Sequence, residues 1–396
     1  MSFLDLDRNA TTPPYPAVVE CVARHLRDTP GNPGSRHAAG RRARRVLEDA
    51  RESLADGLGA EPEEIVFTSG GTEAANLALA GLIRGPRLGE EAADSGPTTV
   101  LVTPGEHPAV AAPLAAGAAA GRWRVRRWPL DENGLLKGDE LENPPPGLRL
   151  VSLIHAHNET GAILDVAPVL VRCNRLGVPS HLDATQAVGK LPWAFRSLGA
   201  TAASLGAHKF RGPRGIGALL IRSGAKLAPS LHGGHQEGGR RPGTEPVALA
   251  AGMALALELR MKELDDWTTH TTALRDRLEA ALRRDCSAVI HAAGAPRLPN
   301  TASVAFPGCG GEELLVALDL AGVGASLGSA CASGSSEPSP VLIAMGLPPE
   351  LLNSSLRFSL LGEEPPEQID EAAARIAACV KRVQEPCEPR HTPKIG

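Results

Sequence analysis

Apolar side chains recur at three- and four-residue intervals between Ser35 and Leu58, and arginines fill many of the positions between them. This spacing predicts an amphipathic helix with a solvated arginine face. Short, nearly continuous apolar runs follow, separated by segments of helical pattern, at residues 64–68, 99–103, 149–154 and 216–221. Runs of this kind are typical of strands covered on both faces. The chain is therefore predicted to have an α/β fold with a mostly parallel sheet.

Other segments complete this picture. The alanine-rich run at residues 109–120 predicts a helix whose small side chains allow close packing. Two stretches rich in proline, glycine and acidic residues, 86–97 and 143–147, are predicted to be surface loops. The residues from 385 onward are expected to form a loose tail, because they cannot bury enough apolar surface to become ordered.

The pattern changes after about residue 260. A charged helix, short strands and a last helix are predicted there, at residues 261–284, near 288 and 303, and at 367–383. For 396 residues, one large and one smaller domain are the simplest division. We expect a large domain over residues 16–259. The remaining residues, 1–15 and 260–396, would form a small domain that carries a loop at about 324–338.

Composition excludes several classes of function. Apolar residues make up 42% of the chain and charged residues 22%, as in ordinary globular proteins. Aromatic residues are only 3%, and 41 basic against 45 acidic residues give a net charge of -4, which argues against nucleic-acid binding. The sequence has neither an 18-residue apolar run nor the pattern of a signal peptide. We expect a soluble cytoplasmic protein that does not bind membranes.

Cysteine and lysine usage limits the chemistry. The seven cysteines lie far apart and form no C-x-x-C pair, which argues against a disulfide framework and against a metal site. Most of them are expected to be small buried apolar residues. Only seven lysines stand beside 34 arginines, so a mechanism that needs an amine has few candidates.

One candidate site follows the strand predicted at residues 64–68. The segment Thr68-Ser-Gly-Gly-Thr-Glu73 leads directly into a helical pattern. Glycines allow close approach of the backbone, and the free N–H groups of a helix N-terminus bind anions such as phosphate. A plain tight turn explains this segment equally well when it is read alone.

A second candidate is Asp183, which comes just after a short predicted strand. Ligands of open α/β sheets bind at the carboxyl ends of the strands, and a carboxylate there can pair with a protonated ring nitrogen. The alternative is an aspartate that caps the next helix.

A third candidate is Lys209, which lies in a short segment between glycines, Gly206-Ala-His-Lys-Phe-Arg-Gly212. A lysine in a partly desolvated pocket has a lowered pKa and can form a Schiff base with an aldehyde. A solvent-facing lysine is the alternative. Together, a phosphate cradle, a carboxylate for a pyridinium nitrogen and an amine are the three groups that pyridoxal phosphate needs.

A fourth candidate is Cys331, in the segment Leu327-Gly-Ser-Ala-Cys-Ala-Ser-Gly. The small residues around it could not pack the thiol into a core. A thiol on such a loop is suited to reaching into a site and carrying a group out of it. The alternative is an incidental loop cysteine.

The sequence resembles the cysteine desulfurases of the NifS-like and IscS-like group, in the class V aminotransferase branch of pyridoxal phosphate enzymes. The resemblance covers nearly the whole chain and rests on many motifs in the family's order. They include Gly31-Asn-Pro-Gly-Ser-Arg-His37, Glu106-His107, His157-Asn-Glu-Thr-Gly161, Ala207-His-Lys209 and Arg357-Phe-Ser359. It implies a fold-type-I pyridoxal phosphate transferase.

The resemblance implies roles around the cofactor ring. Lys209 would hold pyridoxal 5'-phosphate covalently and later move protons. His107 would stack on the pyridine ring and is a candidate acid or base. Asp183 would keep the ring nitrogen protonated, and Gln186 would hydrogen-bond the phenolic oxygen.

The resemblance also implies how the phosphate is held. Thr72, the backbone of Gly71 and His208 would bind it within one chain. The threonine that matches Thr244 reaches the phosphate of the neighbouring subunit in this family, so a homodimer is implied.

For the substrate, the resemblance implies that Asn158 and Arg357 grip the carboxylate of L-cysteine. The thiolate of Cys331 would attack the sulfur, which leaves L-alanine and a persulfide on the enzyme. A sulfur-acceptor protein, such as an iron–sulfur cluster scaffold or a thiolation enzyme, would then take the sulfur.

The chain departs from the family pattern at several positions. Gly206 replaces a serine that usually donates to the phosphate, and a lost hydrogen bond to a charged group is worth about 1.5–3 kcal/mol, which predicts looser cofactor binding. Other departures are Arg8, His157, Pro242, Pro246 and Pro340. A selenocysteine lyase, another class V aminotransferase or a non-catalytic scaffold therefore remain alternative readings.

Overall fold

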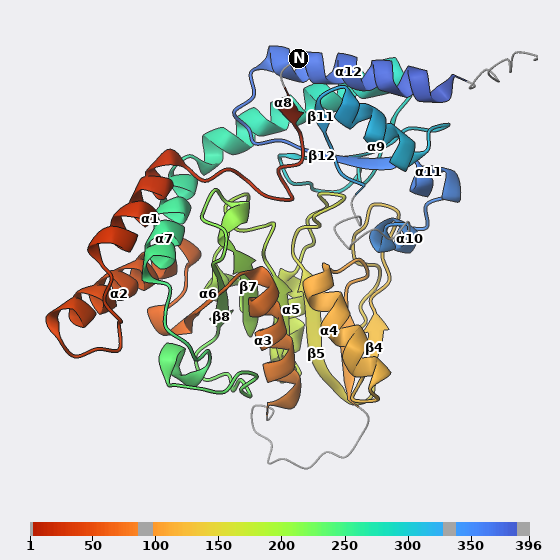
Figure 1. Cartoon of the computed structure of the whole chain (residues 1–396). Helices are drawn as coiled ribbons and strands as arrows, with labels where there is room; N and C mark the ends of the chain where they lie inside the picture. Colours follow the sequence, from red (N-terminus) through yellow and green to blue (C-terminus); the bar gives the residue numbers. More distant parts are fainter. Residues whose placement is uncertain (1–2, 86–97, 328–337, 386–396) are drawn as a thin grey trace, which may run out of the picture.

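The computed structural model describes residues 3–85, 98–327 and 338–385. Within them, a seven-stranded sheet has the strand order β2-β8-β7-β6-β5-β3-β4 (Figure 1). Its strands are β2 Ile65–Thr68, β3 Thr99–Val102, β4 Arg124–Arg127, β5 Leu148–Ile154, β6 Ser180–Asp183, β7 Ala202–Gly206 and β8 Gly217–Ile221. The strands from β7 to β4 pair in parallel, and β8 runs antiparallel to both β7 and β2. The expected α/β fold with a mostly parallel sheet is confirmed.

Helices cover both faces of this sheet. They are α1 Pro16–Asp28, α2 Ala38–Leu58, α3 Gly71–Arg84, α4 Pro108–Ala119, α5 Ala167–Arg175, α6 Phe195–Leu198 and α7 Val247–Lys262. Ile65 and Phe67 of β2 join an apolar cluster with α2, α5 and α7, whereas Val66 joins the cluster beneath α3 and α4. Alternate side chains thus enter opposite cores, which is why the first three residues of the strand are all apolar.

A second group of elements lies at the C-terminal end of the chain. It contains the antiparallel strands β9 Val289–Ile290, β10 Thr301–Ala305 and β12 Ser355–Ser359, and the helices α8 Leu264–Cys286, α9 Gly311–Leu320, α10 Pro340–Ala344, α11 Pro349–Asn353 and α12 Pro366–Gln384. The N-terminal strand β1 Leu4–Asp5 pairs with β11 Val323–Gly324. These elements bury an apolar cluster of their own.

The N-terminal arm therefore packs with the C-terminal part, above the sheet (Figure 1). The division between residues 259 and 260 remains a prediction; α7 ends at Lys262 and α8 begins at Leu264. The expected charged helix at 261–284 corresponds to α8 together with the last residues of α7.

Some expectations fall outside the described residues, namely the loop at 86–97, Cys331 and the tail after residue 385. The five cysteines in the described part are buried and form no disulfide, as expected. Nowhere in the described part does a helix combine the length and apolar character needed to span a bilayer.

Candidate active site

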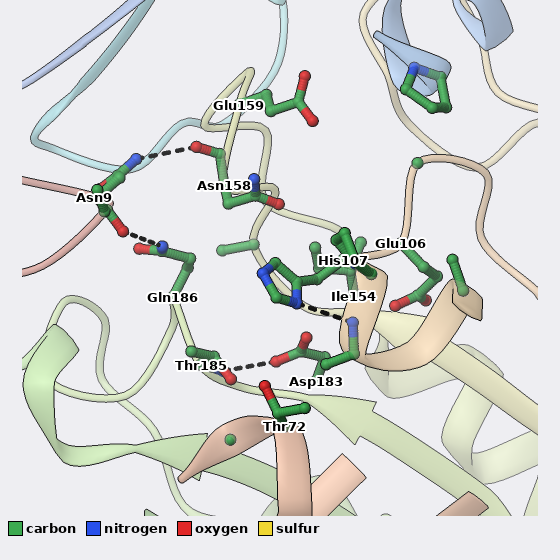
Figure 2. Close-up of a pocket in the computed structure, with 18 of the residues that line it drawn as sticks. Asn9, Thr72, Glu106, His107, Ile154, Asn158, Glu159, Asp183, Thr185 and Gln186 are labelled. Carbon is green, nitrogen blue, oxygen red and sulfur yellow. Dashed lines mark hydrogen bonds between the residues drawn. The ribbon is translucent and has the colours of Figure 1, made fainter. Parts of the chain in front are cut away.

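A cavity of about 630 Å³ lies at the carboxyl ends of the parallel strands. It is lined by the N-terminal arm, the residues that follow β3, β5, β6 and β7, the start of α3, and Arg357 of β12 (Figure 2). Most of the site residues predicted from the sequence meet there: Gly71, Thr72, His107, Asn158, Asp183, Gln186, His208, Lys209 and Arg357. The fold thus joins residues from most of the length of the chain.

The anion cradle is formed where β2 ends and α3 begins at Gly71. Backbone N–H groups of this first helical turn have no partner within the helix and can therefore bind an anion. Close approach of β8 to this turn requires glycine at position 217, because an added Cβ would lie 2.7 Å from the carbonyl carbon of Gly70. His208 lies nearby: a Cβ added at Gly206 would be 3.4 Å from the Gly71 nitrogen and 3.5 Å from the His208 ring.

The histidines of the cavity are neutral near pH 7. Burial, followed by the charge of Lys209, lowers the pKa of His208 to about 4, and its Nδ1 lies 3.2 Å from the hydroxyl of Thr11. Burial also lowers the pKa of His107. The Ala109 N–H donates to Nδ1 of His107 at 3.1 Å, which places the ring proton on Nε2. His107 can therefore present an N–H to a ligand.

Asp183 is the last residue of β6 and is buried. Its Oδ1 accepts a hydrogen bond from the Thr185 N–H at 2.9 Å (Figure 2). Nearby, burial and then the charge of Asp183 raise the pKa of the Glu106 carboxyl to about 8. Glu106 is therefore protonated near pH 7 and leaves the negative charge to Asp183, which suits a partner for a protonated ring nitrogen.

Lys209 ends a short 3-10 helix after β7. Its Nζ donates to the carbonyl oxygens of Asn9 at 2.7 Å and Ala10 at 2.9 Å. The amine is thus positioned by the N-terminal arm at the edge of the cavity. The lysine candidate is not a solvent-facing residue in this fold.

Asn158 lies at the opposite side of the cavity from Thr72 of the anion cradle (Figure 2), and Arg357 also lines the cavity. Arg357 donates from Nη2 to Oδ1 of Asp7 at 2.5 Å and from Nη1 to the Asn158 carbonyl at 3.0 Å. Within the described residues, Nε of Arg357 and Oδ1 of Asn158 are buried without a hydrogen-bond partner. Unsatisfied polar atoms in a cavity indicate that a bound ligand completes them.

Of the predicted site residues that the structure describes, Thr244 does not line the cavity; it is exposed, between β8 and α7. Cys331 lies outside the described residues. On either side of it, the backbone of Ser326 exchanges hydrogen bonds of 3.1 and 2.7 Å with Arg357, and Pro338 lines the cavity.

Other residues of the site were not assigned a role from the sequence. Asn9 bonds both Lys209 and Gln186 through its carbonyl oxygen. Lys190 lies buried behind Gln186, and Ser339 donates to Glu159 at 2.6 Å. Asn9 follows Arg8, one of the departures from the family pattern, but the sequence could not show the role of Asn9. The contacts that define this role join residues far apart in the chain.

The donor set fits pyridoxal phosphate. The cavity offers an anion cradle at one end, a buried carboxylate and a lysine amine, and its unsatisfied Arg357 and Asn158 atoms can complete contacts with an amino-acid carboxylate. The alternative readings of the cradle as a plain turn and of Asp183 as a simple cap do not account for this convergence.

Comparisons with known proteins agree with the site. The family model described as aminotransferase class V matches residues 5–371. A cysteine desulfurase of Nostoc sp. is 39% identical over 97% of this chain and 94% of its own length. An IscS-like cysteine desulfurase of Mycobacterium tuberculosis is 40% identical, with 96% of each chain covered. The solved structure of a NifS-like protein, 33% identical, has a TM-score of 0.86 and covers 96% of this chain and all (100%) of that one.

Proposed function

This chain belongs to the class V aminotransferase family, among its pyridoxal phosphate-dependent cysteine desulfurases, and we propose which of its residues perform the reaction. The reaction takes L-cysteine to L-alanine. The carbon–sulfur bond of the substrate breaks, a sulfur–sulfur bond forms on an enzyme thiol, and the thiol proton is balanced by the proton that the product gains. The convergence of Lys209, Asp183 and the Gly71 cradle in one cavity is the observation that supports this assignment.

Several residues of the cavity would act on the cofactor. Bound pyridoxal phosphate would supply an electron sink for a bound amino acid. Lys209 would hold it covalently and move a proton at the substrate Cα. Gly71, Thr72 and His208 would bind its phosphate, and the carboxylate of Asp183 would keep its ring nitrogen protonated.

His107 and Gln186 complete the cofactor site. His107 would pack on the ring and, being neutral with its proton on Nε2, could donate and then recover a proton. Gln186 would donate to the phenolic oxygen. Glu106 is protonated near pH 7 because its pKa is raised to about 8, so it adds no second negative charge to the cavity wall.

The substrate is held by Arg357 and Asn158. The Nε–H of Arg357 has no partner among the described residues and would bind the carboxylate of L-cysteine together with Asn158, which also lines the cavity. Cys331 receives the sulfur. It is four residues from Leu327, a separation of at most about 14 Å of chain, and the described chain meets the cavity region on both sides of it.

Partners and location follow from the same assignment. We propose a homodimer in which Thr244 binds the phosphate in the neighbouring subunit, which agrees with its exposure and its position outside the cavity. The persulfide is then passed to a sulfur-acceptor protein, an iron–sulfur scaffold or a thiolation enzyme. The proposed compartment is the cytoplasm.

The test is chemical trapping of both covalent states. Borohydride treatment of the cofactor-loaded protein should fix the label on Lys209, and incubation with L-cysteine should add one sulfur atom to Cys331, both read by peptide mass spectrometry. A label on any other lysine, or none, would overturn the role of Lys209.

A matched variant separates the remaining readings. Cys331→Ala should retain the Lys209 label. Its rate of sulfide release from L-cysteine should fall well below that of the wild-type protein. Full activity of that variant, or a clear preference for L-selenocysteine, would favour a lyase instead. Protein that does not bind the cofactor at all would indicate a scaffold.

A further inference from the structure

Lys190 is a buried lysine that the proposed reaction does not use. It follows β6 in the turn that carries Gln186, and it is 3% exposed. Gly189 allows the chain to turn there at φ +74°, since an added Cβ would lie 2.6 Å from Cβ of Phe210. The fold thus directs the side chain of residue 190 into the protein beneath the cavity.

The contacts of this amine are two amide oxygens. Nζ of Lys190 donates to Oδ1 of Asn9 at 2.8 Å and to Oε1 of Gln186. No carboxylate pairs with it among the residues that the structure describes. Burial, followed by the charges of three cations, Lys209, Arg260 and Arg357, lowers the pKa of this amine. Burying a lysine in such surroundings is costly, so a functional reason is needed.

The hydrogen bonds determine how the Gln186 amide is oriented. On one side, its Nε2 donates to the Asn9 carbonyl oxygen at 3.0 Å, and a carbonyl can only accept (Figure 2). On the other side, the lysine amine donates to Oε1. A charged amine has three hydrogens and a neutral amine has two, so both bonds of Lys190 are made in either state.

The neighbouring amide is fixed in the same way. Oδ1 of Asn9 accepts from both Lys190 and Nδ2 of Asn300, the latter at 3.0 Å. Nδ2 of Asn9 donates to the Thr301 hydroxyl at 2.8 Å. The network is therefore self-consistent, and reversing Gln186 would place two oxygens against each other and two donors against each other.

One hydrogen of Nε2 of Gln186 remains after the bond to Asn9, and Gln186 lines the cavity. We propose that Lys190 is a positioning residue: by donating to Oε1 of Gln186, it holds the amide so that an N–H faces the cavity and binds the phenolic oxygen of the cofactor. The inference rests on the proposed function of Gln186.

The test compares Lys190→Met with wild type as holoenzymes. Methionine has a similar volume but no donor, so Oε1 of Gln186 loses its partner and only the bond of Nε2 to the Asn9 carbonyl oxygen still orients the amide. The less firmly held amide should bind an anionic oxygen more weakly. We expect pyridoxal phosphate to bind about tenfold more weakly, as for one lost hydrogen bond to a charged group. The pH midpoint of the visible absorption change should rise by about one unit, because the anionic oxygen loses a donor that stabilised it.

A double-mutant cycle identifies the route of the effect. If Lys190 acts through Gln186, Lys190→Met should change neither the cofactor affinity nor the pH midpoint in a Gln186→Ala background. A lysine with only a structural role would change the cofactor affinity by the same factor, and the pH midpoint by the same amount, in the two backgrounds. Lys262→Met, at an exposed position paired with Glu258, is the control for loss of one lysine charge.

The outcomes separate this inference from the proposed function. The role of Lys190 would be overturned if Lys190→Met had the wild-type pH midpoint, or if it changed the cofactor affinity equally in the wild-type and Gln186→Ala backgrounds. The Lys209 label would be unaffected by either result. Absence of the Lys209 label in the wild-type protein would overturn the proposed function itself.

Discussion

Glycine 206 stands where the resembled family usually has a serine, and its surroundings show what that serine would reach. The backbone of Gly206 has ordinary extended angles, φ -129° and ψ 130°, so a side chain causes no strain. The nearest atoms to an added Cβ are the Gly71 nitrogen and the His208 ring, which belong to the anion cradle. A hydroxyl at position 206 would therefore lie at the anion cradle, which is the proposed phosphate site.

Gly206→Ser should consequently tighten cofactor binding. One added hydrogen bond to a charged group predicts about a tenfold lower dissociation constant for pyridoxal phosphate, measured by titration of the apo-protein. Gly206→Ala is the matched control, because it adds the Cβ without the hydroxyl and should leave the affinity near that of wild type. Equal affinity of the serine and wild-type proteins would contradict the prediction.

Another departure, His157, has a visible structural role. Its Nε2 lies 2.9 Å from the Gly105 carbonyl oxygen and its Nδ1 accepts from the Glu159 N–H at 3.2 Å. Burial lowers the pKa of this ring, so the neutral form that makes both bonds persists. The histidine thus joins the segment that carries His107 to the segment that carries Asn158.

At the scale of elements, α10 begins at a residue that is tied to the cavity wall. The buried Ser339 hydroxyl donates to Oε2 of Glu159 at 2.6 Å and caps α10 by accepting from the Leu342 N–H at 3.5 Å. Pro340 occupies the first turn of α10, where its missing N–H has no cost. This pair anchors the chain where it returns from the segment that contains Cys331.

Ser339→Ala should slow sulfur transfer while leaving cofactor binding intact. Removing the donor leaves a buried carboxylate oxygen without its partner, at a cost of about 1–3 kcal/mol. We expect the rate of persulfide formation on Cys331 to fall about tenfold, measured by quenched-flow mass spectrometry, with an unchanged pyridoxal phosphate affinity. Ser339→Thr, which keeps the hydroxyl, should retain the rate. A wild-type rate in the alanine variant would show that the bond from Ser339 to Glu159 is not needed for sulfur transfer.

The elements also show what a sequence can predict. The apolar strands β2, β3, β5 and β8 were recognisable because both of their faces are buried. Strand β4, Arg-Val-Arg-Arg, was not, because it lies at the edge of the sheet and is mostly exposed. Strand β7, Ala-Ala-Ser-Leu-Gly, was missed because its small residues carry little strand preference.

The site shows the same division. Asp183 and the Gly71 turn could be recognised as candidates because each comes after a predicted strand, and Lys209 because glycines lie on both sides of it. The pairing of Arg357 with Asp7, or of Lys190 with Asn9, could not, because partners separated by 350 and 181 residues meet only through the tertiary fold.

For the whole molecule, buried histidines make the folded state sensitive to acid. Burial lowers the pKa of His155, His181, His208 and His291 to about 4, from 6.5 in an unfolded chain. Between these values the unfolded chain binds more protons than the folded one, so stability is full above pH 6.5 and falls as the pH drops. Glu106 opposes this by one proton, since its pKa is raised to about 8 in the folded state.

These five groups together account for three net protons, so we expect their contribution to lower the free energy of unfolding by about 4 kcal/mol per pH unit between pH 6 and 4.5. Urea denaturation at several pH values measures this slope. His291→Gln, away from the cavity and next to Ser355, should reduce the slope by about one third. A stability that does not change over this range would refute the burial argument.

A mixed dimer tests whether Thr244 acts across subunits. If it does, a heterodimer of Lys209→Ala and Thr244→Ala subunits contains one site with both native residues, and it should bind cofactor on that site with wild-type affinity. If Thr244 acts within its own chain, no site in the heterodimer is intact. Cofactor titration of co-expressed, differently tagged subunits distinguishes these results.

Asn9 has a consequence for how the protein is made. Its N–H donates to the Ser359 hydroxyl at 2.8 Å, its side chain bonds Thr301, and its carbonyl oxygen receives the Lys209 amine. Asn9 is therefore synthesised long before Thr301 and Ser359, which hold it in the position where it binds the Lys209 amine. We expect that chains which end before residue 359 do not bind the vitamin B6 derivative, and that cofactor binding begins only after synthesis is nearly complete.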